Sequence, residues 1–110
     1  MQATLQDNKV LLTLSGRIDL SSRQHLRTLI EDGLAKGATD VLLDLCEVSF
    51  IDSAGFGALI ACCSLGQKHG GRLLLTRIPK RVYDLMELTR LVHVFEIVDA
   101  VECGLASDTQ

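Results

Sequence analysis

The sequence lacks the features of several large classes of protein. No uninterrupted apolar run in its 110 residues approaches the roughly 18 residues that a membrane-spanning helix needs. Its first residues do not have the basic-then-apolar order of a secretory signal. It has no basic tract and its formal net charge is -3, so neither nucleic acid nor an anionic membrane surface is an expected partner. We therefore expect a cytoplasmic protein that binds other proteins.

The motifs of common enzymes and metal sites are also missing. The cysteines form no C-x-x-C pair, so no zinc site is predicted. There is no G-x-x-x-x-G-K-(S/T) loop for a nucleotide, and the three histidines are scattered along the chain. Ser53 does not lie in G-x-S-x-G, because Ile51 stands two positions before it. We expect no catalysis, no cofactor and no metal; the alternative, a small hydrolase acting through Ser53, would show activity on a generic ester.

What the sequence has is enough apolar material for one small domain over residues 1–110. Its hydrophobic content is 47%, and strand-like and helix-like segments alternate without a linker or repeat. This alternation predicts an α/β fold with a mixed, mostly parallel sheet of four to five strands, packed with about four α-helices. The first strand is expected to be antiparallel at an edge. The predicted strands cover residues 3–5, 10–14, 41–45, 72–76 and 94–97.

Capping signals set the expected limits of three of these helices. Ser21 with Gln24 matches a capping box, and Gly37 suits the end of the helix that follows. Pro79 suits the first turn of a later helix. Residues 99 and 102, an Asp and a Glu, match a second capping box that would open a short C-terminal helix.

The most informative segment is residues 48–60, V-S-F-I-D-S-A-G-F-G-A-L-I. Asp52 is a strong N-cap residue, and helical periodicity begins near Phe56, so Ser53 is expected in the first helical turn. Backbone N–H groups in that turn have no intrahelical acceptor, and the helix dipole favours negative charge there. A phosphate on Ser53 would therefore be tolerated. From the residues alone, the simpler interpretation is an exposed serine that merely begins a helix.

The same segment resembles the signature of STAS domains, and in particular of the anti-sigma factor antagonists, in which D-S-(S/A/T)-G-(L/F)-G follows a hydrophobic strand. Residues 14–20, L-S-G-R-I-D-L, resemble the G-x-(L/I)-D block of that family. Residues 88–97 resemble its L-x-G-L-x-x-V-F-x-I block, with Arg90 where the family often has glycine. The resemblance implies that Ser53 is the phosphorylated residue and that Asp19 lies near it.

Two loops are expected to meet at the carboxyl edge of the sheet, where functional groups collect in such folds. One carries Asp52 and Ser53, and the other carries Arg17 and Asp19. If the loops adjoin, Asp19 and Asp52 flank the Ser53 hydroxyl. An alternative for Asp19 is a cap on the helix that begins near Ser21.

Small residues at the start of the helix after Ser53 predict a flat docking surface. Ala54, Gly55, Gly57 and Ala58 would let a partner's backbone approach, and Arg17 is assigned to the same partner-binding surface. The alternative is close packing of this helix against its own sheet. Both can hold, since Gly55 and Gly57 need not face the same way.

The resemblance implies a phosphorylation-switched binding module. Unphosphorylated protein would bind an anti-sigma factor that is also a serine kinase of the histidine-kinase-like ATPase class, and phosphorylation of Ser53 would release it. A PP2C-type phosphatase would reset the switch. The alternative is a STAS subunit of a membrane complex for lipid or anion transport, in which the same helix docks on an ATPase subunit.

Overall fold

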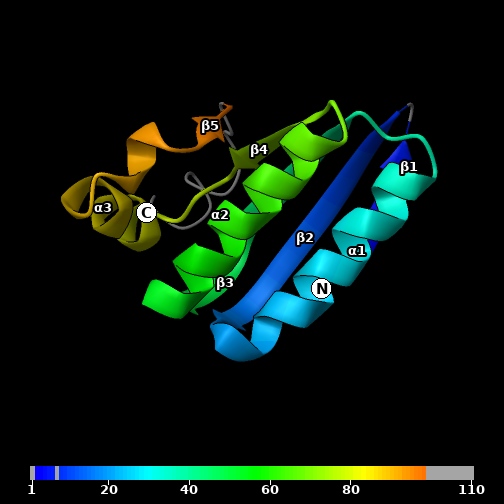
Figure 1. The fold of residues 1–110 in the computed structure, drawn as a ribbon. Helices are drawn as coiled ribbons and strands as arrows, with labels where there is room; N and C mark the ends of the chain where they lie inside the picture. The colour runs from blue at the N-terminus through cyan, green and yellow to red at the C-terminus, as the bar shows by residue number, and fades with distance from the viewer. Residues whose placement is uncertain (1, 7, 99–110) are drawn as a thin grey trace.

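The computed structural model describes residues 2–6 and 8–98. It contains one five-stranded sheet with α-helices in the connections (Figure 1). The strands are β1 (Gln2–Gln6), β2 (Lys9–Ile18), β3 (Asp40–Ile51), β4 (Arg72–Thr76) and β5 (Glu96–Ile97). The helices are α1 (Arg23–Ala35), α2 (Ser53–Lys68) and α3 (Lys80–Leu88), with 3₁₀ turns η1 (Leu20–Ser22) and η2 (Leu91–His93).

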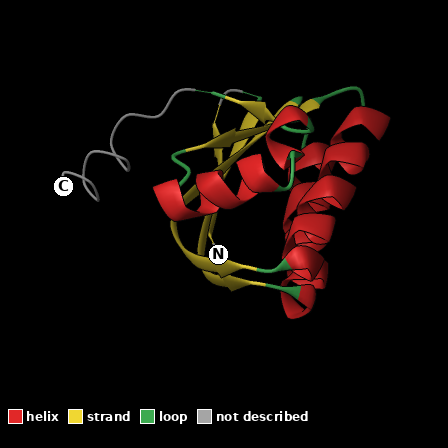
Figure 2. Cartoon of the chain, turned by 90° about the vertical axis from the view of Figure 1, so that its left-hand side faces the viewer, coloured by secondary structure: helices red, strands yellow, loops and turns green. Residues whose placement is uncertain are grey.

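The strand order is β1-β2-β3-β4-β5, and the predicted fold class is confirmed. β1 is an edge strand antiparallel to β2, and the other neighbouring pairs are parallel. Helices α1 and α2 lie side by side on one face of the sheet (Figure 2). Leu12, Leu43 and Leu75, register partners across β2, β3 and β4, are fully buried in the core. Burial of each such side chain contributes about 2 kcal/mol.

Strands β2 and β3 are longer than their apolar segments predicted. β3 pairs with β4 only over its first five residues, Asp40 to Asp44, whereas β2 follows it to Ile51. The register between β2 and β3 shifts near Gly16, whose φ of +72° suits glycine. The polar residues near these shifts interrupt the apolar pattern, and the pairing resumes after each shift. The two strands therefore run on past β4 and end together where α2 begins.

The helix limits differ from the predicted caps in two places. The capping box at Ser21 and Gln24 was wrong, because Asp19 caps the turn η1 and α1 begins only at Arg23. Pro79 is the N-cap of α3 rather than a residue of its first turn. Gly37, with φ of +97°, follows the end of α1 as predicted.

The C-terminal predictions are tested only in part. The last predicted strand is shorter than expected, because η2 precedes it and β5 comprises Glu96–Ile97. The helix predicted to open at residue 99 lies outside the described residues, and the described part of the chain contains three α-helices. None of these three is long and apolar enough to cross a membrane.

Candidate functional site

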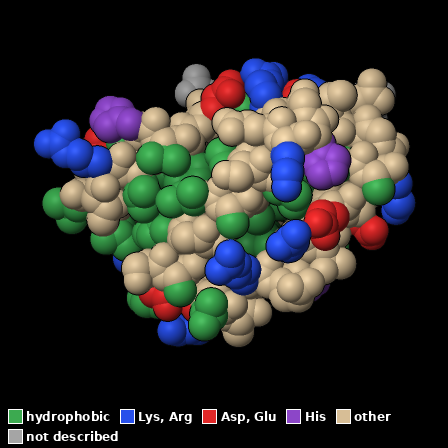
Figure 3. All heavy atoms as spheres, viewed as in Figure 1, with side chains coloured by type: hydrophobic (Ala, Val, Ile, Leu, Met, Phe, Trp, Pro, Cys, Tyr) green, Lys and Arg blue, Asp and Glu red, His purple; other side chains and the backbone are tan. Residues whose placement is uncertain are grey.

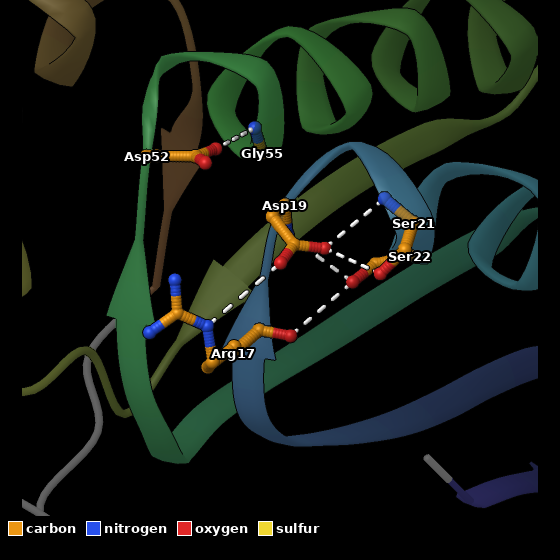
Figure 4. A network of polar contacts seen from close by, with 6 residues as sticks. All are labelled: Arg17, Asp19, Ser21, Ser22, Asp52 and Gly55. Atoms are coloured by element: carbon orange, nitrogen blue, oxygen red, sulfur yellow. Dashed lines mark hydrogen bonds and ion pairs between the residues drawn. The ribbon is translucent and has the colours of Figure 1, made fainter.

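The carboxyl ends of β2 and β3 meet at one edge of the sheet. Ile18 and Ile51 are register partners, and the N–H of Asp52 donates a hydrogen bond of 3.4 Å to the carbonyl of Ile18. The next residue on each strand is an aspartate, Asp19 or Asp52. The structure therefore brings together the two loops that the sequence predicted to adjoin (Figure 4).

Asp52 caps α2, as predicted. Its extended backbone ends β3, and its Oδ1 accepts a hydrogen bond of 2.8 Å from the N–H of Gly55. Its carbonyl accepts the first helical bond, 2.9 Å from the N–H of Phe56. This cap satisfies one of the four N–H groups that a helix start leaves without a partner. Ser53 is the first residue of α2 and its side chain is exposed.

The position of Ser53 at a helix start favours a negatively charged group on its side chain. The N–H groups of Ser53 and Ala54 point out of the first turn without intrahelical acceptors, as at every helix start. The positive end of the helix dipole adds to them. An anion on the Ser53 hydroxyl would therefore meet unpaired donors, although Asp52 contributes a negative charge beside it.

Asp19 is held by the serines that follow it. Its Oδ1 accepts hydrogen bonds from the hydroxyl of Ser21, at 2.6 Å, and from the N–H of Ser21, at 3.0 Å. Arg17 Nε lies 3.8 Å from its Oδ2. The Ser21 hydroxyl, helped by the Ser21 N–H and by the charge of Arg17, lowers the pKa of Asp19. Asp19 therefore carries a fixed negative charge at neutral pH.

Ser22 links Asp19 to Arg17 through its hydroxyl group. It is buried, its hydroxyl donates to the carbonyl of Arg17 at 3.2 Å, and it accepts from the N–H of Asp19 at 3.2 Å (Figure 4). Asp19 and Ser22 form a capping box at the turn η1. Asp19 therefore caps the 3₁₀ turn that precedes α1, whose own N-cap is Ser22, and it also lies beside the Ser53 loop. The D-L-S-S sequence, an aspartate followed by two serines, was the signal for this network.

Arg17 lies beside an aromatic residue that sequence reasoning did not assign to the site. Arg17 and Phe50 are register partners on β2 and β3, and the guanidinium carbon lies 4.5 Å from the centre of the Phe50 ring. The Arg17 side chain is 65% exposed, and Phe50 is 42% exposed. An exposed ring next to a cation is an anchor of the kind found at protein interfaces.

The four small residues of α2 do not share one role. Gly55 is buried, and an added Cβ would overlap the carbonyl of Ile18, so this glycine allows α2 to pack on the end of β2. Ala58 is also buried. Neither lines the exposed surface, which corrects the predicted docking set. Gly57 is exposed with open space beside it, and Ala54 is half-buried.

The described residues offer no candidate metal site. Within residues 2–6 and 8–98, no three His, Cys, Asp or Glu side chains form a group that could hold a metal ion. The aspartates of the site are engaged by Ser21, Arg17 and Gly55 instead. The chemistry that the described geometry offers is an exposed hydroxyl at a helix start, bordered by carboxylates.

This combination of fold and site defines a class. The STAS domain model matches residues 1–103, so the chain belongs to the STAS domain family. Among curated proteins it is similar to the anti-sigma-B factor antagonist of Bacillus subtilis (strain 168), with 29% identity over 99 residues that cover 90% of each chain.

Solved structures agree on the fold. The unphosphorylated anti-sigma factor antagonist SpoIIAA matches with a TM-score of 0.68 at 21% identity, over 92% of this chain and 89% of that one. A sulfate transporter family protein from Wolinella succinogenes matches with a TM-score of 0.75 at 19% identity, over 94% and 86% of the two chains. Because both kinds of protein share the fold, the fold does not choose between the predicted function and its transport alternative.

Proposed function

We propose that this chain is an anti-sigma factor antagonist whose binding to an anti-sigma factor is switched off by phosphorylation of Ser53. The observation that carries the proposal is the exposed Ser53 at the start of α2, directly after the capping Asp52 and on the same sheet edge as Asp19. The similarity to a curated antagonist over 90% of the chain supports the same role.

The binding surface in this proposal is the outer face of α2. Ser53, Gly57 and Ile60 are all exposed, and their spacing of four and three residues puts them on one side of the helix. Gly57 has no heavy atom within 4 Å of an added Cβ. A partner's backbone can therefore approach the helix closely at Gly57, with Ile60 as an apolar contact and Arg17 with Phe50 at the strand ends.

The partner in this proposal is also the kinase, of the histidine-kinase-like ATPase class. The Ser53 oxygen forms a bond to the γ-phosphorus of ATP, the bond from that phosphorus to the β,γ-bridging oxygen breaks, and ADP leaves. The hydroxyl proton passes to a base of the kinase, which also supplies the metal ion. The acceptor contributes only a positioned hydroxyl. A PP2C-type phosphatase hydrolyses the phosphoserine and restores the binding form.

A phosphate on Ser53 has opposite effects on the stability of the free protein and on that of its complex with the partner. In the free protein, the helix start and solvent both stabilise the phosphate, the helix start by about 0.3–1 kcal/mol. In the complex, a charge of about -1.5 to -2 enters a dehydrated interface beside Asp52 and Asp19. Because Asp19 is ionised and fixed by Ser21, it cannot turn away or take up a proton readily. Repulsion and desolvation then favour release of the partner.

The test begins with the partner that co-purifies with the full chain. Incubation with that kinase and ATP should add one phosphate, at Ser53, and the phosphorylated protein should bind at least tenfold more weakly by titration calorimetry. Ser21 is the matched control, since it is an exposed serine in the neighbouring loop. Phosphate on Ser21 with Ser53 unmodified, or unchanged affinity after phosphorylation of Ser53, would overturn the proposal.

A further inference from the structure

A groove of about 390 Å³ lies between α1 and α2, apart from the Ser53 site. Its floor is formed by Ala58, Cys62 and Leu65 of α2, and Ala61 lies at its wall. Ala58 and Cys62 are buried, whereas Ala61 is exposed. Because two of these residues are alanines, the helices leave space between them where larger side chains would fill it.

Three cations border this apolar floor. Arg23 and Arg27 come from α1, and Lys68 comes from the last turn of α2. Arg27 is paired with Glu31 on its own helix, with Nε and Oε2 3.3 Å apart. Within the described part of the chain, neither Arg23 nor Lys68 forms an ion pair. Figure 3 shows Lys and Arg side chains beside hydrophobic ones on the face that carries α1 and α2.

The Cys62 thiol reports the environment of the floor. Burial raises its pKa to about 11, even though the charges of Arg23 and Arg27 act in the opposite direction. Cys62 is thus buried at the groove, where the charges of Arg23 and Arg27 act on its thiol. Apolar side chains bordered by cations thus line a groove in a protein whose net charge is -3.

We propose that this groove binds an amphipathic organic anion, a molecule with an apolar body and one carboxylate or phosphate head group. The body would lie on Ala58, Cys62 and Leu65, and the head group would pair with one of the two bordering cations that form no ion pair, Arg23 towards one end of the groove or Lys68 towards the other. The volume falls within the roughly 300–1,000 Å³ of small-molecule pockets. From Ala58 to Lys68 the groove extends about 15 Å along α2.

The affinity of the unmodified full chain is measured by displacement of 1-anilinonaphthalene-8-sulfonate, followed by its fluorescence, and by titration calorimetry. Decanoate and decyl phosphate are the two anionic competitors, and decanol is the neutral one. We expect at least one of the anions to bind with a dissociation constant at least tenfold below that of decanol. Comparison of the two anions identifies the preferred head group. Equal binding of decanol would overturn the proposal.

Two variants test the location. Ala61→Leu fills the groove from an exposed position and should weaken binding at least tenfold, while Ala35→Leu, at the exposed last residue of α1, should leave it unchanged. The double change Arg23→Gln with Lys68→Gln should weaken anion binding tenfold and leave decanol binding as it was. Circular dichroism of each variant should match the wild type. Retained anion binding in folded Ala61→Leu protein would overturn the assignment, and it would leave the Ser53 proposal unaffected.

Discussion

Gly55 lies against the carbonyl oxygen of Ile18 so closely that no side chain fits between them. This contact fixes the first turn of α2 on the end of β2. It therefore also fixes the distance between the Ser53 loop, which begins α2, and the Asp19 loop, which follows β2. The glycine of the D-S-A-G block thus serves the geometry of the site from a buried position.

The first prediction follows from that contact. Gly55→Ala should destabilise the protein by about 1–3 kcal/mol, because the added methyl group must push α2 away from backbone atoms that cannot give way. Urea unfolding followed by circular dichroism measures the change. Gly57→Ala is the matched control: its Cβ meets open space, so it should gain up to about 1 kcal/mol in helix propensity. Equal effects of the two changes would contradict the packing role of Gly55.

The second prediction concerns the outer face of α2. Gly57→Leu should weaken binding of the anti-sigma factor by more than tenfold, because the new side chain occupies the space that a partner's backbone needs. Its far-UV circular dichroism and melting temperature should stay native, since that space is empty in the free protein. An unfolded variant would show that the glycine is needed for internal packing, and unchanged affinity would remove this face from the interface.

The sequence predicted the fold class and the Ser53 helix start because both depend on local signals. Apolar alternation identifies strands, and Asp52 before a helical pattern identifies a cap. The length of β3 could not be predicted, because Glu47 and Ser49 look like loop residues, whereas Glu47, Val48 and Phe50 pair with β2 and keep this segment in the strand. The contact between Arg17 and Phe50 was missed for the same reason, since it depends on register across two strands. Similarly, the sequence could not show that Gly55 is packed against the sheet and that Gly57 is exposed, because this depends on how α2 packs on the sheet.

The third prediction concerns Arg90, which lies between α3 and η2. Arg90 has φ of +63°, a left-handed conformation that suits glycine and strains a residue with a Cβ atom. Arg90→Gly should therefore stabilise the protein by about 0.5–1 kcal/mol, after the greater flexibility of glycine in the unfolded chain is subtracted. Thermal melting measures the gain. Arg90→Ala, which keeps the strain, should change stability little, and a gain as large as that of glycine would show that the backbone conformation is not the cause.

The fourth prediction is a pH dependence of the site. The hydrogen bonds from Ser21 lower the pKa of Asp19, so the folded state holds its proton less tightly than the unfolded chain does. The stability contributed by Asp19 is present above about pH 4, the range of unperturbed carboxyls, and is lost as the pH falls through the lowered pKa. Carboxyl NMR titration should place Asp19 below its ordinary value. Ser21→Ala should raise the pKa of Asp19, and an unchanged pKa would remove Ser21 as the main cause.

The last prediction separates charge from the loss of the hydroxyl at position 53. Ser53→Ala removes the phosphate acceptor and adds neither charge nor bulk, and alanine suits an early helical position, so fold and partner affinity should change little. Ser53→Asp places a carboxylate next to Asp52 and near Asp19 in the proposed interface. A desolvated, unpaired charge costs on the order of 2 kcal/mol, which corresponds to roughly a thirtyfold loss of affinity.

Stability should respond in the opposite direction to affinity. In the free protein the new carboxylate lies at the positive end of the α2 dipole, so Ser53→Asp should melt no lower than the wild type. Titration calorimetry of both variants against the partner decides the question. Equal affinities of the Ala and Asp variants would mean that charge at position 53 does not control binding. Docking of α2 on an ATPase subunit of a transport complex, which needs no phosphate, would then be the better explanation of this exposed helix start.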